Sequence, residues 1–126
     1  MCMKVENGAR TRRSFRRIRC WKVVEFKSDR GVWTGPYYAF DSYLEGDVVR
    51  SNGRVNVEFG TVRHGLHTYA DKSDALVVSN RMNKNHCGLF CVVECEIPRF
   101  VRYIEGFGYD GSRQYVSEML KVIKFV

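Results

Sequence analysis

The chain has 126 residues, of which 44% are hydrophobic, and a formal net charge of +7. This length suits a single domain that can bury a core without disulfides or metal ions. No run of 18 apolar residues is present, which excludes a membrane-spanning helix. Because no apolar segment follows the basic N-terminus, we expect no secretory signal.

The positive charge is concentrated in the first 22 residues. They hold eight basic side chains and one acidic one, whereas the rest of the chain holds 13 of each. We therefore expect residues 1–17 to form a flexible basic arm and residues 18–126 to form one folded domain. Arginine-rich segments bind anions, so the expected partner is nucleic acid or an acidic protein surface. The residues expected to contact it are Arg10, Arg12, Arg13, Arg16, Arg17, Arg19, Lys22 and Trp21.

The first half of the domain reads as strands separated by turns. Residues 18–26 predict a strand whose hydrophobic face is interrupted by Lys22. Residues 32–33 and 37–40 predict a second strand, which is irregular because Gly35-Pro36 lies inside it. An Asn-Gly pair at 52–53 predicts a β-hairpin that joins residues 47–50 and 55–59.

The second half contains the predicted helix. Asp71 suits an N-cap, and the helix is expected over about residues 71–82, with a packed side of Ala75, Leu76, Ser79 and Met82. Further strands are expected at residues 65–69, 88–97, 100–104 and 122–125, while residues 115–121 leave a second short helix open. The sequence therefore predicts an α+β fold with a mostly antiparallel sheet of about six or seven strands.

A dense group of cysteines and one histidine raises the question of a metal site, with the ligands His86, Cys87, Cys91 and Cys95. In a strand, Cys91 and Cys95 lie about 13 Å apart, which is too far to share one tetrahedral zinc ion. We therefore expect no metal and interpret Cys91 and Cys95 as core residues beside Val93 and Ile97. The chain has five cysteines, and this odd number is not typical of a disulfide-bonded secreted domain. It favours free thiols in a reducing cytosol.

The segment of residues 62–69 carries the second candidate site. If it is a strand, His67 and Tyr69 share a face with Gly65, which would let a ligand approach the backbone. The alternative is a hydrogen-bonded structural histidine at a junction between strand and helix. Both interpretations stay open at this point.

Several short motifs in the second half of the chain suggest a resemblance. In order they are Gly65-Leu66-His67-Thr68-Tyr69, the helix start at 71–75, Val93-Glu94-Cys95-Glu96-Ile97-Pro98, Tyr103-Ile104-Glu105-Gly106 and Tyr115-x-Ser117-Glu118-x-Leu120. This layout resembles a group of small uncharacterised bacterial and phage proteins. The resemblance covers about residues 60–125 and implies a prokaryotic or phage protein in the cytoplasm of the bacterial host cell.

A second resemblance is to the ADP-ribosyltransferase fold. It rests on His64-Gly65, Thr68-Tyr69, Ala75 and Glu118, which match in chain order the family's His-Gly strand, its Ser/Thr strand with the following helix, and its late glutamate. It implies a pocket for NAD or another nucleotide, with His64, His67, Tyr69 and Glu118 as the catalytic candidates.

The leading functional expectation is a binding protein without a cofactor rather than an enzyme. The basic arm would bind nucleic acid or an acidic protein partner, and in a phage such a protein would serve as an accessory or anti-defence factor. The alternative is the enzyme or nucleotide-pocket protein implied by the ADP-ribosyltransferase resemblance. We expect no membrane partner.

Overall fold

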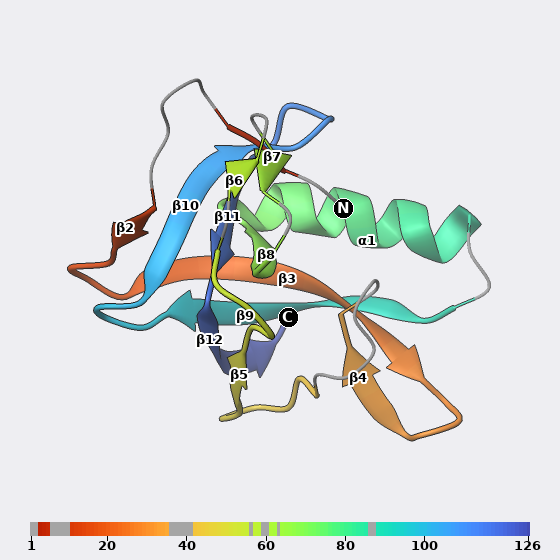
Figure 1. Cartoon of the computed structure of the whole chain (residues 1–126). Coiled ribbons are helices and arrows are strands. Elements are labelled where there is room, and N and C mark those ends of the chain that lie inside the picture. Colours follow the sequence, from red (N-terminus) through yellow and green to blue (C-terminus); the bar gives the residue numbers. More distant parts are fainter. Residues whose placement is uncertain are drawn as a thin grey trace.

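The computed structural model describes residues 3–5, 11–35, 42–55, 57–58, 61–62, 64–85 and 88–126. In them, one helix packs on one face of an antiparallel sheet (Figure 1), which confirms the α+β class. The longer strands are β3 (Ile18–Lys27), β8 (Leu66–Tyr69), β9 (Phe90–Ile97), β10 (Arg102–Phe107), β11 (Arg113–Ser117) and β12 (Met119–Phe125). The strands of two or three residues are β1 (Met3–Lys4), β2 (Arg12–Arg13), β4 (Val32–Thr34), β5 (Val48–Arg50), β6 (Val57–Glu58) and β7 (Thr61–Val62).

The strand order is β5-β12-β9-β3-β8-β11-β10-β1-β7-β6, with β2 paired to β10 and β4 paired to β3. The centre of the sheet is the long pair of β3 and β9, which stays in register from Ile18 opposite Ile97 to Glu25 opposite Phe90. As expected, β9 ends directly before Pro98, which cannot donate a ladder hydrogen bond.

The sheet curls around its main core. This core cluster joins Val49 of β5 and Leu120 of β12 to Leu66 of β8, and Tyr103 of β10 packs against it. Strands this far apart in the order share one cluster only if the sheet bends strongly. The connection from β5 to β6 supports this bend. β5 and β6 lie at the two ends of the strand order, yet the six residues 51–56 that join them can span at most about 25 Å.

The helix α1 (Lys72–Asn85) covers the opposite face of the sheet, where Ala75 and Val78 pack against Val23 and Val92. Leu76, expected on the packed side, is 37% exposed. The helix also extends three residues past Met82 because Asn83 fastens it to β9. The Asn83 amide donates to the Phe90 carbonyl at 2.9 Å and accepts from the Phe90 N–H at 2.8 Å. Among the described residues, no helix is long and apolar enough to cross a membrane.

Two local expectations are wrong. The Asn52-Gly53 hairpin does not form, because β5 pairs with β12 and β6 pairs with β7. Val49 and Val55, which flank the pair, are drawn into different core clusters, so tertiary packing overrides the turn signal. The second short helix that the sequence allows at residues 115–121 does not form, because residues 115–117 belong to β11 and residues 119–121 to β12.

Residues 11–17, expected in a flexible arm, are joined to the body of the fold. β2 pairs with β10, and β1 pairs with β10 and β7. Ser14 is only 2% exposed, and its backbone N–H donates to the Val101 carbonyl at 3.0 Å. The basic side chains of this segment are therefore presented from an ordered strand and turn.

Candidate functional site

A cleft of about 430 Å³ opens where β2, β5, β10 and β12 approach one another. We call it the arginine cleft, because four of its lining residues are Arg13, Arg50, Arg54 and Arg102. Only one acidic side chain, Glu118, is among the described residues that line it. The formal charge of the lining is therefore +3.

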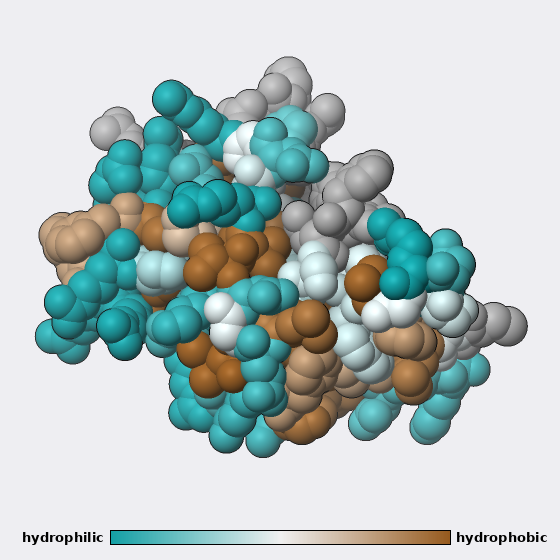
Figure 2. Space-filling model, turned by 90° about the horizontal axis from the view of Figure 1, so that it is seen from below, coloured by the Kyte–Doolittle hydropathy of each residue, from teal (hydrophilic) through white to brown (hydrophobic). Residues whose placement is uncertain are grey.

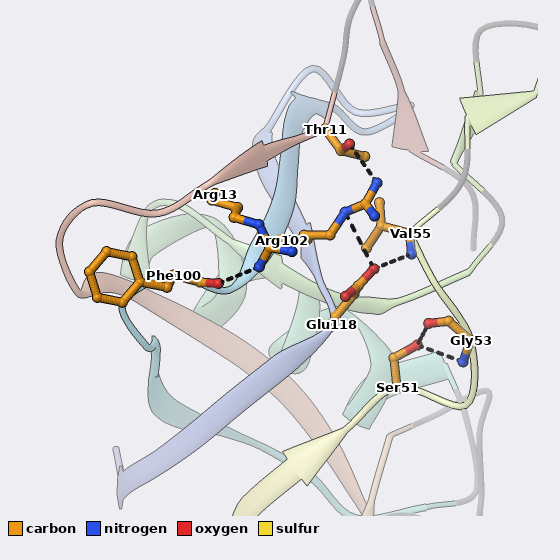
Figure 3. Close-up of polar contacts among 8 residues, drawn as sticks. All are labelled: Thr11, Arg13, Ser51, Gly53, Val55, Phe100, Arg102 and Glu118. Atoms are coloured by element: carbon orange, nitrogen blue, oxygen red, sulfur yellow. Dashed lines mark hydrogen bonds and ion pairs between the residues drawn. The ribbon is translucent and has the colours of Figure 1, made fainter.

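Two of these arginines are held by hydrogen bonds (Figure 3). Arg13 donates to the Phe100 carbonyl at 2.9 Å, and Arg102 donates to the Thr11 hydroxyl at 3.0 Å. Glu118 lies 3.8 Å from the Arg102 Nε atom and accepts from the Val55 N–H at 3.1 Å. The single carboxylate is thus already engaged.

Arg50 and Arg54 come from the connection that leaves β5. Both are exposed, and within the described part of the chain neither has a carboxylate partner. The backbone between them is shaped by Ser51, whose hydroxyl donates to the Gly53 carbonyl at 2.7 Å. Among the described residues that line the cleft, these two guanidinium groups are the cations without an ion-pair partner, and each can form a forked pair with a phosphate or carboxylate.

Arg13 and Arg102 lie directly opposite each other in the β2–β10 pair. Like charges at opposite positions of an antiparallel pair destabilise the sheet. An anion bound between the strands would remove this repulsion. The cleft therefore concentrates positive charge that a bound anion would offset.

A basic tip, defined as residues 12–17 and 99–102, lies beside the cleft. It carries six arginines and no acidic residue. Ser14 holds its two segments together, because its hydroxyl donates to the Pro98 carbonyl at 2.5 Å and accepts from the Val101 N–H at 3.2 Å. In Figure 2, hydrophobic atoms lie beside hydrophilic ones at the end of the molecule that carries these two segments.

The structure places the predicted anion-binding residues in different surroundings. Arg12, Arg13, Arg16 and Arg17 are exposed, whereas Arg10 lies outside the described residues. Arg19 is exposed but pairs with Glu94 and stacks over the Trp21 ring at 5.3 Å. Trp21 itself is half-buried against the cluster beneath α1.

Lys22 differs most from the expectation, because it is buried rather than exposed to a ligand. It is 8% exposed, and its Nζ atom donates to the His67 carbonyl at 2.8 Å. The Lys22 Nζ atom also lies 5.6 Å from the centre of the Tyr43 ring. Lys22 stabilises the interior and is removed from the proposed contact surface.

The second candidate site has a different character from the expected pocket. His64 is exposed, whereas His67 is half-buried with its Nε2 atom shielded from solvent, and this desolvation together with nearby Lys22 lowers the pKa of His67 to about 3. Tyr69 packs in the cluster beneath α1, and Glu118 faces the arginine cleft. Gly65 leaves no space for a ligand, since a Cβ there would lie 2.4 Å from the Val116 side chain.

The cysteines behave as core residues. Cys20 and Cys95 are fully buried and Cys91 is half-buried, and all three are free thiols. Burial raises the pKa of Cys20 to about 12 and that of Cys91 to about 11. The described residues contain no cluster that could hold a metal ion, and Cys2, His86 and Cys87 lie outside them.

Sequence reasoning missed half of this site. Arg50, Arg54 and Arg102 belong to the part of the chain whose charges balance, so a sum over residues 23–126 concealed them. The sequence also predicts a strand that begins at Phe100, whereas β10 begins at Arg102 and Phe100 lies in the turn before it. The available signal was local, because Arg99, Phe100 and Arg102 repeat the mixture of arginine and phenylalanine found at residues 13–17.

Comparisons with known proteins give no relative: the chain matches no family model, no curated protein and no solved structure. The resemblances to bacterial and phage proteins and to ADP-ribosyltransferases therefore gain no support from them. What the structure establishes is an α+β fold, and the geometry of the arginine cleft carries the functional argument.

Proposed function

We propose that this protein binds nucleic acid through the arginine cleft and the adjoining basic tip. The observation that carries the proposal is the cleft itself, where four arginines from three segments of the chain face a single engaged carboxylate. Guanidinium groups form forked hydrogen bonds with phosphate oxygens. A cleft with two unpaired arginines is suited to a backbone that carries a phosphate at every nucleotide.

Arg50 and Arg54 give the proposal its sharpest test. Binding that releases counterions weakens with salt by roughly 0.7–0.9 log units per phosphate for each tenfold rise in salt concentration. Fluorescence anisotropy with labelled oligonucleotides, measured across a salt series, gives this slope. For the double variant R50A/R54A we expect a loss of affinity of roughly tenfold or more and a shallower slope.

The matched control removes two positive charges elsewhere. Arg30 in the β3–β4 turn and Lys84 in the last turn of α1 are both exposed. In Figure 1 the β3–β4 turn and the C-terminal end of α1 lie at the opposite end of the molecule from β2. R30A/K84A has the same net charge as R50A/R54A, and we expect it to bind almost as tightly as the wild type. Equal losses of affinity in the two variants would mean that only the net charge matters for binding, and they would contradict the proposal.

An acidic protein partner is the competing outcome. Polyglutamate presents carboxylates without bases or a phosphate backbone, so it serves as the competitor in the same assay. We expect unlabelled nucleic acid to displace the labelled oligonucleotide more readily than polyglutamate does. The two competitors are compared at equal concentrations of negative charge. Tighter binding to polyglutamate would overturn the assignment to nucleic acid.

A further inference from the structure

The two most exposed phenylalanines of the described chain lie at the basic tip. Phe15 is 86% exposed and Phe100 is 66% exposed. Their backbones are neighbours, because the Phe100 N–H donates at 2.6 Å to the carbonyl of Ser14, the residue before Phe15. Phe100 also lines the arginine cleft. Two apolar rings therefore stand beside a group of cations.

The backbone at Phe100 is held in an unfavourable conformation to present its ring. Its φ angle is +65°, and it is the one residue other than glycine with a positive φ in the described chain. A bulky side chain in this region is an outlier that the surrounding structure has to enforce. The hydrogen bonds of Ser14 to residues 98, 100 and 101 supply that enforcement. Core packing does not explain the arrangement, since the ring points into solvent.

We infer that the ligand is single-stranded nucleic acid, with phosphates in the arginine cleft and bases stacked on Phe15 and Phe100. The inference rests on the proposed function and narrows its ligand. Every base offers a flat face to an aromatic ring, and such stacking tolerates any sequence. Arginine planes near the rings, such as Arg16 and Arg99, can stack on further bases.

The arrangement favours a single strand over the other anionic partners. In a duplex the base faces are already stacked, so the rings would gain contact only by opening it. A flat anionic membrane could take up the two rings, but it could not place phosphates inside a cleft whose walls hold Arg50 and Arg102. Of these three ligands, a flexible single strand is the one that reaches the cleft and the rings together.

The test compares strands with and without bases. The ring variant is F15A/F100G, because glycine suits the positive φ at position 100 and therefore keeps the turn. Y109A is the control, since Tyr109 is 68% exposed but belongs to the turn between β10 and β11. The probes are a 20-nucleotide DNA strand, an abasic strand with the same phosphates, and a duplex of the same length.

For the wild type we expect tighter binding to the normal strand than to either of the other two probes. F15A/F100G should lose roughly fivefold or more in affinity for the normal strand and bind the abasic strand as the wild type does. Y109A should behave as the wild type. Equal losses on all three probes, or no loss on any, would overturn the inference.

These outcomes separate the inference from the proposed function. If R50A/R54A weakens binding while F15A/F100G does not, the inference fails and the nucleic-acid proposal stands. If neither double variant changes the affinity, both fail. Binding to phosphatidylserine vesicles that depends on both rings, without a preference for the normal strand over the abasic one, would assign the rings to a membrane surface and overturn the inference.

Discussion

The backbone N–H of Phe100 donates a 2.6 Å hydrogen bond to the carbonyl of Ser14, which joins two segments that lie more than 80 residues apart in the chain. The Ser14 hydroxyl adds contacts with Pro98 and Val101. One small buried side chain thereby holds the turn that carries Phe100 and the strand that carries Arg13. The order of the basic tip depends on this residue.

S14A removes both contacts of the hydroxyl and leaves the Val101 N–H without that acceptor. Because Ser14 is 2% exposed, we expect the free energy of unfolding to fall by about 1–3 kcal/mol, measured by urea denaturation. S28A, in the exposed β3–β4 turn, is the control and should change stability by less than about 0.5 kcal/mol. A neutral S14A variant would show that the hydroxyl does not hold the tip.

N83A should separate the end of α1 from β9. The Asn83 amide makes two hydrogen bonds to the backbone of Phe90, and their loss should destabilise the fold by about 1–2 kcal/mol. N80A corrects for the higher helix propensity of alanine, since Asn80 is exposed on the same helix. A thermal or urea unfolding curve of N83A that matches that of N80A would contradict this role.

The sequence predicted the elements whose signals are local and strong. β9 followed from its β-branched residues and Pro98, and α1 followed from Asp71 and the spacing of Ala75 and Ser79. The register of β5 did not, because the strand pairs with β12, which lies about 70 residues away in sequence. Such a pairing depends on the curl of the whole sheet, so the residues of β5 alone do not indicate which strand they pair with.

The candidate site was only half predictable for a related reason. Arg12, Arg13, Arg16 and Arg17 were found because they are adjacent in sequence. Arg50 and Arg102 reach the same cleft through long-range strand pairing. A sum of charges along the sequence does not show which residues such pairing brings together. The expectation of an exposed Lys22 is wrong because a basic residue in a strand is normally exposed, whereas here Lys22 is buried and donates a hydrogen bond to the His67 carbonyl.

His67 should make the protein less stable in mild acid. Its pKa is about 3 in the fold, below the ordinary value of 6.5, so the unfolded chain binds a proton that the folded chain does not. Stability from this group is therefore complete above about pH 6.5 and falls by about 1.4 kcal/mol per pH unit as the pH drops toward 3. Urea denaturation between pH 7 and pH 5 avoids most carboxylate titration. H67Q should flatten the slope, whereas H64Q, at an exposed position, should keep it; equal slopes in wild type and H67Q would refute the assignment.

The buried thiols should resist modification until the protein unfolds. Burial raises the pKa of Cys20, Cys91 and Cys95, so little reactive thiolate exists near neutral pH. In a C2S/C87S background, reaction with a thiol reagent such as DTNB should accelerate only where urea unfolds the chain. Fast reaction of more than one thiol in the native protein would contradict the burial of Cys20 and Cys95.

C95S should cost about 1–3 kcal/mol, because it places a hydroxyl in the core.

G65A should be among the most damaging single substitutions, for two separable reasons. Gly65 has a φ angle of +116°, and a Cβ there would lie 2.4 Å from the Val116 side chain and 3.1 Å from that of Val55. Strain of about 1–2 kcal/mol from the positive φ adds to about 1–3 kcal/mol from the forced repacking.

Gly31 also has a positive φ, +65°, but nothing lies within 4 Å of its Cβ position, so G31A carries backbone strain without the clash. Urea denaturation should therefore show a larger loss of stability for G65A than for G31A, and the φ of +116° adds to this difference because it lies farther than +65° from the left-handed region. Equal losses in the two would mean that Val116 and Val55 leave room at Gly65, and the ligand-accessible backbone expected there from the sequence would be reinstated.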